Sequence, residues 1–364
     1  MLLAPFLAWF LLHLCSSPAP PPSPPSSPAD IGRAALAAAS AVPQVTADVP
    51  SELLLPLYEA FPPYFSSLPT DLQSLCVNLH ERCTAWAAQG ECAANPNFMQ
   101  LQCRPACRSC DLLLYSNRCP VPDDLSAAYE PGDLDRVFEA IALSFPDLQP
   151  RVVSSPPDPW LVVFDAFISA QESRALIDAG TSLGFARSTG IGPTLPDGQH
   201  ERVEIKSRTS RNAWCKKDSV CETDPLVVRV NERVEQVTRI PYDNYEHLQL
   251  LHYREGEFYH LHHDFLPNFT THDGNRLVTL FIYLNDVEEG GETWFPDVLQ
   301  GGIKIKPKLG RAVLWPNVMN QDPAARDGRT YHEALAVTKG EKYAANAWGH
   351  IHGFKALQEK HCTS

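Results

Sequence analysis

The sequence lacks an excess of basic residues, since its 30 Lys and Arg are outnumbered by 43 Asp and Glu, for a net charge of −13 at pH 7. A chain this acidic has no bulk electrostatic affinity for nucleic acid, so no nucleic-acid partner is expected. Internal repeats are absent as well. After the first 15 residues, no stretch approaches the roughly 20 apolar residues that a membrane-spanning helix needs.

The one long apolar segment is Leu2–Cys15, which is interrupted only by Pro5 and His13. Its 14 residues are too few for a membrane span and fit the apolar region of a secretory signal peptide, which we assign to residues 1–17. Basic residues before the run are missing, so an uncleaved signal anchor, and with it a membrane tether, is the alternative. Both interpretations predict the secretory pathway: the endoplasmic reticulum or Golgi lumen, membrane-anchored or secreted.

Proline is abundant, with 33 residues in the chain, and seven of the eleven residues from Pro18 to Pro28 are proline. Such a tract predicts an extended, polyproline-II-like spacer. An alanine-rich stretch with few charges follows, so we expect a Pro/Ala-rich linker over 18–70. A second connecting segment is expected over 112–157, with one helix around Asp133–Ser144.

Eleven cysteines are too many for an ordinary cytosolic chain, and six of them lie within 35 residues. A segment this short cannot bury enough apolar surface to fold alone, so disulfides are the expected staple. Zinc is the weaker alternative, because the spacing has no paired C-x₂-C motifs and the compartment is oxidising. The spacing leaves the connectivity open. The six residues are Cys76, Cys83, Cys92, Cys103, Cys107 and Cys110.

The pattern C-x₆-C-x₈-C-x₁₀-C-x₃-C-x₂-C, with Trp86-Ala87 and Asn95–Met99, resembles an ShK-type domain, the fold of a sea-anemone potassium-channel toxin. The resemblance implies such a domain over 71–111. It also implies the disulfides Cys76–Cys110, Cys83–Cys103 and Cys92–Cys107. The Lys-Tyr pair with which the toxins plug the channel is missing between the third and fourth cysteines, so channel blocking is not expected. The module is expected to contact another protein or to tether the chain.

The remainder of the chain has the pattern of one continuous domain. Ser169-Ala-Gln-Glu172 is a capping box before an amphipathic run to Ala179, with Gly180 as a stop signal, and Asp224-Pro225 opens a helix to about Thr238. Short β segments follow at 247–254, 257–265, 277–285, 303–307, 311–315, 330–337 and 343–350. This order predicts a mainly β fold with flanking helices, a double-stranded β-helix or jelly roll.

The strongest chemical signal is the segment FYHLHHDF. Residues two apart on a strand share a face, so His262 and Asp264 project together while His263 points away. A histidine from a distant strand would complete the 2-His-1-carboxylate set that suits non-haem Fe(II) with open positions, and His332 lies on such a segment. His260 shares the face of His262, so a zinc-like His-x-His pair is the alternative.

Lys342 follows His332 by ten residues, on what should be the neighbouring strand. A buried lysine that faces a metal pocket needs an anion. A dicarboxylate cosubstrate that chelates iron at one end would present its other carboxylate to this amine. Each motif alone is weak, but the order of H-x-D, Gly-Gly-Glu-Thr, His and Lys is specific in combination.

That order resembles the 2-oxoglutarate/Fe(II)-dependent prolyl 4-hydroxylases, especially the plant and green-algal type, over roughly 158–353. The matching segments are Ser207–Ser210, Leu248–Tyr253, Tyr283–Pro296 and Lys339–Tyr343. The resemblance implies peptidyl-proline 4-hydroxylation coupled to oxidative decarboxylation of 2-oxoglutarate to succinate and CO₂. The implied cofactors and cosubstrates are Fe(II), 2-oxoglutarate, O₂ and L-ascorbate. A catalytic domain is expected over 158–354, with an oxygenase core at about 245–351, and a tail over 355–364.

The resemblance also implies residue roles. His262, Asp264 and His332 match the iron ligands. Lys342 matches the partner of the distal 2-oxoglutarate carboxylate, with hydrogen bonds expected from Tyr253 and Thr293. The positions that match the peptide groove are Arg208, Ser210, Glu246, Tyr259, Arg276 and Trp348. The implied substrate is a proline-rich secreted or cell-wall protein. The alternatives are a related oxygenase acting on another residue, such as lysine, and a catalytically inactive secreted binding protein.

Four cysteines after residue 111 and one sequon remain. Cys215 and Cys221 are expected to form a disulfide beside the groove, with two free thiols as the alternative. Cys119 and Cys362 either pair with each other or stay free. Asn268 begins the sequence Asn-Phe-Thr and is a candidate for glycosylation.

Overall fold

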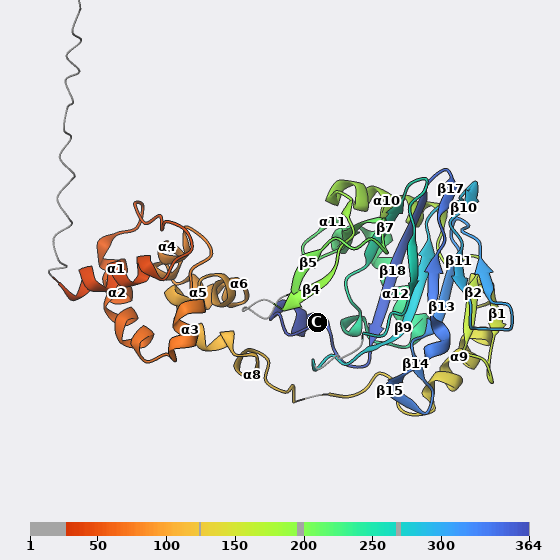
Figure 1. Cartoon of the computed structure of the whole chain (residues 1–364), viewed down its shortest axis with the longest axis horizontal. Coiled ribbons are helices and arrows are strands. Elements are labelled where there is room, and N and C mark those ends of the chain that lie inside the picture. Colours follow the sequence, from red (N-terminus) through yellow and green to blue (C-terminus); the bar gives the residue numbers. More distant parts are fainter. Residues whose placement is uncertain (1–26, 124, 195–199, 267–270, 364) are drawn as a thin grey trace, which may run out of the picture. The chain divides into compact units, whose positions relative to one another are not determined.

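The computed structural model describes residues 27–123, 125–194, 200–266 and 271–363, and the chain divides into two compact units, Met1–Arg108 and Ser109–Ser364 (Figure 1). Within the described ranges, every helix is too short or too polar to cross a membrane. The expected signal segment at 1–17 and the sequon at Asn268 lie outside the described residues.

The first unit begins with two helices where a linker was expected. α1 (Pro28–Ala38) and α2 (Ser51–Ser66) pack together, and a Cβ at Gly32 would lie 1.6 Å from the carbonyl oxygen of Tyr58, so this crossing requires glycine. Their shared core contains Leu36, Ala39, Val49, Leu54, Tyr58, Phe61 and Ala85. The linker expected over 18–70 is therefore wrong for residues 28–66, because apolar side chains at helical spacing give this segment a core of its own.

The cysteine module continues the first unit as a set of short helices. These are α3 (Thr70–Leu75), α4 (Cys83–Ala88), α5 (Glu91–Ala94), α6 (Pro96–Gln102) and α7 (Arg104–Cys107). The disulfides Cys83–Cys103 and Cys92–Cys107 confirm two of the expected pairs. Cys76 and Cys110 are each disulfide-bonded, and the pair expected between them stays a prediction. A hydrophobic core this small cannot stabilise the module alone, and the disulfides supply the remaining stability.

The second unit is built on two antiparallel sheets, which confirms the predicted jelly roll. The eight-stranded sheet has the order β1 (Pro150–Ser154), β2 (Leu161–Phe164), β13 (Ala312–Pro316), β9 (Arg276–Tyr283), β18 (Lys342–His350), β7 (Gln249–Tyr253), β6 (Arg211–Trp214) and β3 (Ala186–Arg187). The four-stranded sheet has the order β12 (Ile303–Ile305), β11 (Thr293–Phe295), β16 (His332–Ala334) and β8 (Tyr259–His262).

Shorter elements complete this unit. Three strand pairs are β4 (Gly190–Thr194) with β5 (His200–Val203), β10 (Glu289–Gly290) with β17 (Val337–Lys339), and β14 (Val318–Met319) with β15 (Asp322–Arg326). Short helices are η1 (Cys110–Leu113), α8 (Tyr115–Arg118), η2 (Pro146–Leu148), α11 (Val220–Thr223), η3 (Tyr242–Asn244), η4 (Gly328–Thr330) and α13 (Lys355–Glu359).

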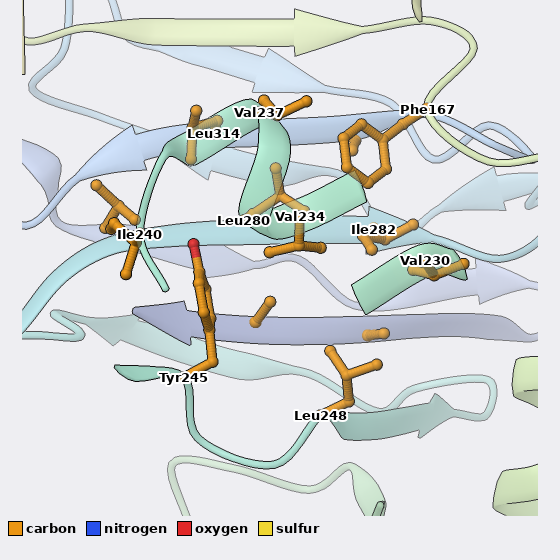
Figure 2. Close-up of a cluster of buried hydrophobic side chains, with 14 of the residues drawn as sticks. Phe167, Val230, Val234, Val237, Ile240, Tyr245, Leu248, Leu280, Ile282 and Leu314 are labelled. Atoms are coloured by element: carbon orange, nitrogen blue, oxygen red, sulfur yellow. The ribbon is translucent and has the colours of Figure 1, made fainter. Parts of the chain in front are cut away.

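The eight-stranded sheet is buried on both faces, as alternate residues of β9 illustrate. Leu280 and Ile282 belong to the core under the long helices, and Figure 2 shows them beside Val230 and Val234. Phe281 and Tyr283 belong instead to the core shared with the four-stranded sheet. Because successive residues of a strand point to opposite faces, a strand covered on both sides is apolar almost throughout.

Three long helices were expected in this unit, and the two with capping signals, α10 (Ala170–Leu183) and α12 (Pro225–Thr238), begin where those signals predicted. α9 (Asp133–Ser144) matches the expected helix. In α10, Ser169 and Glu172 form the reciprocal capping box, and the Asp224 side chain caps α12 by accepting a hydrogen bond from the backbone N–H of its second residue at 2.7 Å. All three helices contribute to the core that covers one face of the large sheet.

The expected stop of α10 at Gly180 is wrong, because the helix continues to Leu183. Gly180 is buried, and a Cβ on it would lie 2.4 Å from the ring of Phe185. The absence of a side chain at Gly180 therefore leaves space against the helix for the ring of Phe185. The helix ends before Gly184, whose φ of +83° is the left-handed conformation that glycine adopts most readily.

Both remaining disulfides form within the second unit. Cys215 pairs with Cys221, as expected, across a sequence separation of 6. Cys119 pairs with Cys362 across a separation of 243, which decides between the two alternatives for these cysteines. The second bond joins the start of this unit to its C-terminal end.

Candidate metal and cosubstrate site

Strand pairing brings the three expected metal ligands together. β16 runs antiparallel to β8 with His332 directly opposite His262, and Asp264 lies two residues beyond β8. One ligand atom from each of the three side chains lies within 4.8 Å of the others. His262 Nε2 is 3.9 Å from Asp264 Oδ1, and His332 Nε2 is 3.7 Å from Asp264 Oδ2. The set is thus one carboxylate and two imidazoles around one point.

Both histidines present the same nitrogen to this point. His262 Nδ1 is 2.8 Å from the carbonyl oxygen of His260, and His332 Nδ1 is 3.1 Å from that of Thr330. A carbonyl can only accept, so each Nδ1 carries the proton and each Nε2 keeps a lone pair for a metal. Burial, followed by the neighbouring His332, lowers the pKa of His262 well below its usual value, which favours the neutral form that metals bind.

Asp264 is ionised in this setting. Burial alone would raise its pKa, but the imidazoles of His332 and His262 and the guanidinium of Arg276 hold it below the usual value. A hydrogen bond from the Thr279 hydroxyl to Oδ2, at 2.7 Å, acts in the same direction. A buried carboxylate with this character is a strong ligand for a divalent cation.

The other two histidines of the motif do not belong to the ligand set. His263 points away and lies 2.9 Å through Nε2 from the carbonyl of Asp327 and 3.0 Å from the hydroxyl of Thr330, as expected. His260 has a side chain that is 58% exposed and lies 3.1 Å from Glu333. The His-x-His alternative is therefore wrong, because the His260 side chain is exposed and lies outside the cluster of His262, Asp264 and His332.

Lys342 on β18 carries a fully buried amine. Its strand β18 pairs with β7, where Tyr253 is its direct partner. Nζ donates a hydrogen bond to the carbonyl of Gly291 at 2.8 Å and lies 5.1, 5.1 and 5.4 Å from the ring centroids of Tyr253, Phe281 and Tyr283. Burial lowers the pKa of Lys342 to about 7. No carboxylate of the described residues forms an ion pair with this amine, so it can accept an anionic ligand.

Thr293 lies on β11, next to β16, and Tyr253 lies on β7, next to β18. Thr293 is opposite Ala334 on β16, two residues from His332, and its hydroxyl accepts a hydrogen bond from the Tyr283 hydroxyl at 2.7 Å. Tyr283 was not among the predicted site residues. Its position in the expected strand 277–285 could have indicated it, because residues 279, 281 and 283 share the face that looks toward the second sheet.

The six predicted groove residues form two clusters beside the ligands. In the first, Arg208 donates to Ser210 Oγ at 3.1 Å and to Gln249 Oε1 at 2.9 Å, and its guanidinium lies 4.7 Å from the Tyr259 ring centroid. The Tyr259 ring is stacked on that of His262, with 3.6 Å between centroids. This cluster therefore adjoins the ligand set through an aromatic contact.

The second cluster is built on a buried ion pair. Arg276 Nε donates to Glu246 Oε1 at 2.6 Å, and its guanidinium lies 3.9 Å from the Trp348 ring centroid. Burial opposes ionisation of Glu246, but Arg276 and His350 outweigh it and lower its pKa to about 2. Arg276 also donates to the backbone oxygen of Asp264 at 3.3 Å. A cation, a carboxylate and an indole ring thus adjoin the other side of the ligand set.

Two family models match the chain: the 2OG-Fe(II) oxygenase superfamily over residues 248–350, and the ShK domain-like family over residues 75–110. The first contains all three candidate metal ligands and Lys342. The second covers the six clustered cysteines.

Among curated proteins, Prolyl 4-hydroxylase 5 of Arabidopsis thaliana is 31% identical over 216 residues, which cover 54% of this chain and 70% of that protein. Prolyl 4-hydroxylase subunit alpha-2 of Gallus gallus is 37% identical over 155 residues, which cover 42% of this chain but only 27% of that subunit. A solved structure, the viral collagen prolyl hydroxylase of Paramecium Bursaria Chlorella virus-1 with 2OG, is 27% identical, with a TM-score of 0.39 over 52% of this chain and 96% of that one. The chain belongs to the prolyl 4-hydroxylase family of 2OG-Fe(II) oxygenases.

Proposed function

We propose that this protein is a 2-oxoglutarate-dependent dioxygenase that 4-hydroxylates proline residues in proline-rich secreted or cell-wall proteins. The observation that carries the proposal is the meeting of His262, Asp264 and His332 at one point, with the buried amine of Lys342 nearby. An inactive binding protein would not be expected to keep three ligands and a fully buried cation, because an unneeded buried charge destabilises the fold.

The donor set fits Fe(II). Two neutral imidazoles and one carboxylate form the facial triad that leaves positions open for other ligands. Fe(II) with 2-oxoglutarate and O₂ supplies the oxidising chemistry that replaces a C–H bond of the substrate proline with C–OH. The chain's own contribution is to hold the ligands, to neutralise the cosubstrate and to place the peptide.

Lys342 is the group that would hold the distal carboxylate of 2-oxoglutarate. With a pKa of about 7, Nζ is only partly protonated at neutral pH, and an anion beside it would favour the charged form. The Tyr253 and Thr293 hydroxyls line the same region and are suited to further hydrogen bonds to that carboxylate. Because the amine is fully buried, its pairing with a carboxylate excludes water from this end of the site.

The two side-chain clusters suit a proline-rich peptide. Tyr259 and Trp348 supply one aromatic ring to each cluster, aromatic side chains suit pyrrolidine rings, and the polyproline-II conformation needs little ordering on binding. The Arg208 and Arg276 guanidinium groups lie over these rings and carry donors that can bond peptide carbonyls. We assign these four residues, with Ser210 and Glu246, to the peptide groove.

We place the protein in the lumen of the endoplasmic reticulum or Golgi, secreted or anchored by its N-terminal segment. All ten cysteines among the described residues are disulfide-bonded, which supports an oxidising compartment. L-Ascorbate is the proposed reductant, and Asn268 the proposed glycosylation site. For the ShK-type module we propose a contact with another protein.

The test is product analysis after incubation with Fe(II), 2-oxoglutarate and either poly-proline or a Ser-Pro-repeat peptide. Wild type is expected to form 4-hydroxyproline and succinate. Asp264→Ala should abolish both products, whereas Lys342→Ala should mainly raise the 2-oxoglutarate requirement. Glu139→Ala, which removes an exposed carboxylate from α9, is the matched control and should behave as wild type. Hydroxylysine as the only product would redirect the proposal to the lysine alternative, and unchanged turnover in both site variants would overturn it.

A further inference from the structure

One oxygen of the Asp264 carboxylate is already occupied within the protein. Oδ2 accepts a hydrogen bond of 2.7 Å from the hydroxyl of Thr279, a fully buried residue in the middle of β9. Among the described residues, no donor is bonded to Oδ1, which faces His262 Nε2 at 3.9 Å. The two oxygens of this carboxylate therefore have different surroundings.

A second buried residue, Asn317, determines which way the Thr279 hydroxyl points. Asn317 is fully buried, and its amide nitrogen Nδ2 donates to Thr279 Oγ1 at 2.9 Å. A hydroxyl has one proton, so when its oxygen accepts from Asn317 the proton is free to be donated to Asp264. With the amide turned over, an acceptor would face Thr279 and compete with Asp264 for that proton.

The backbone of Asn317 is held in place from two sides. Its N–H donates to the carbonyl of Leu277 on β9 at 2.7 Å, and its carbonyl accepts from the N–H of Asp327 at 3.0 Å. Thr279 lies between β13 and β18 and pairs with Trp315 on one side and Trp348 on the other. Both members of the chain are thus fixed by the sheet, so they can orient a carboxylate that lies beyond the end of its own strand.

We infer that Thr279 and Asn317 are positioning residues that hold the Asp264 carboxylate in the orientation in which it binds the metal. This inference rests on the proposed function. Its consequence is that the carboxylate oxygens already face His262 and His332 before a metal binds. The hydrogen-bond chain Asn317–Thr279–Asp264 therefore reduces the ordering that this ligand needs when the metal binds.

The test uses the full disulfide-bonded chain and Mn²⁺ alone as the probe, with free Mn²⁺ followed by electron paramagnetic resonance. Thr279→Val removes the hydrogen-bond donor to Asp264 with little change of volume. It is expected to weaken Mn²⁺ binding by about 10- to 100-fold, which is the usual effect of removing a residue that hydrogen-bonds to a metal ligand. Thr279→Ser keeps the hydroxyl and should restore binding to near the wild-type value. Thr238→Val, which removes a buried hydroxyl from α12, controls for lost stability and should leave Mn²⁺ affinity unchanged.

Asn317→Leu tests the second step of the chain. It is expected to weaken Mn²⁺ binding by roughly tenfold, and the double variant with Thr279→Val should bind no worse than Thr279→Val alone, because Asn317 acts only through the hydroxyl. Should Asn317→Leu fail to fold, as judged by circular dichroism, the comparison of Thr279→Val with Thr279→Ser still decides.

The outcomes separate this inference from the function on which it rests. If wild type does not bind Mn²⁺, the metal site itself is rejected. If Thr279→Val binds Mn²⁺ as tightly as wild type, or if the Val and Ser variants lose the same amount of Mn²⁺ affinity, the positioning role is overturned and the metal site stands. A further loss in the double variant would show that Asn317 acts on the ligands by another route and would also overturn the chain.

Discussion

Replacing Lys342 by methionine is expected to stabilise the cosubstrate-free protein and to remove its response to 2-oxoglutarate. Methionine is close to lysine in length and volume and carries no charge. In the folded chain, burial lowers the pKa of Lys342 from 10.5 to about 7. The difference of about 3.5 units, at 1.36 kcal/mol each, corresponds to at most about 5 kcal/mol of destabilisation by the buried charge.

Part of this gain is offset, because the Gly291 carbonyl loses its donor at a cost of about 1–3 kcal/mol. The net stabilisation is then about 3 kcal/mol at pH 7 or below. For a unit of this size, about 1 kcal/mol moves the unfolding temperature by roughly 2–4 °C, so a rise near 10 °C is expected. The unfolded chain keeps its Lys342 proton up to about pH 10.5, whereas the folded chain releases it above about pH 7. The free energy of unfolding of wild type therefore rises between about pH 7 and pH 10.5, and the stability advantage of Lys342→Met shrinks across the same pH range.

The assay is thermal unfolding by scanning calorimetry at pH 6.5 and pH 9.5, with and without Mn²⁺ plus saturating 2-oxoglutarate. Wild type should gain stability from the cosubstrate, and Lys342→Met should not. Lys339→Met is the matched control, since Lys339 is 65% exposed in its ion pair with Glu288 and should change little. A lower unfolding temperature of Lys342→Met at pH 6.5, together with an undiminished response to 2-oxoglutarate, would refute the reasoning.

Three further changes test other parts of the structure. Glu246→Gln should lower the free energy of unfolding by roughly 3 kcal/mol above pH 4.5, because the pKa of the carboxylate paired with Arg276 is about 2 in the folded chain and 4.5 in the unfolded chain. In urea titrations, the difference in this free energy between variant and wild type should close as the pH falls toward 2. A difference that stays constant with pH would contradict this. Cys362→Ser opens the bond to Cys119 and should destabilise the second unit by up to about 5 kcal/mol, as a closed loop of 243 residues implies; unchanged calorimetric unfolding would contradict it. Gly32→Ala would place a Cβ 1.6 Å from a backbone oxygen of α2. Hydrogen-exchange protection of α1 and α2 should therefore fall, while that of the second unit stays the same. Unchanged protection in both helices would refute the close crossing.

Much of the fold could be predicted from local patterns. The starts of α10 and α12 were predicted correctly because capping side chains, and in α12 a proline at the first helical position, act on the residues next to them. Seven strands of the oxygenase core were found by their apolar runs and the turn residues between them. Several strands were missed, among them β1, β2 and β11, because segments of three to five residues carry too little periodicity to be recognised.

Tertiary contacts decided what local patterns could not. The end of α10 moved past Gly180 because a ring from outside the helix packs on that glycine, and residues 28–66 became helical around a shared core instead of remaining a linker. The first outcome depends on how the ring of Phe185 packs after the helix has ended, and the second on the contact between two helices, so propensity alone did not predict either.

For the site, the sequence by itself determined the donor types: the spacing in H-x-D, the distant histidine and the lysine ten residues later specify which atoms are available. Only the tertiary structure decided how those atoms are used. The register of β16 against β8 sets His332 opposite His262, and the pairing of β13 with β9 brings Asn317 to Thr279 and so to Asp264. Composition and spacing describe residues that are near one another in the sequence. Strand register is set by the burial of whole strands against each other, and those strands come from distant parts of the sequence.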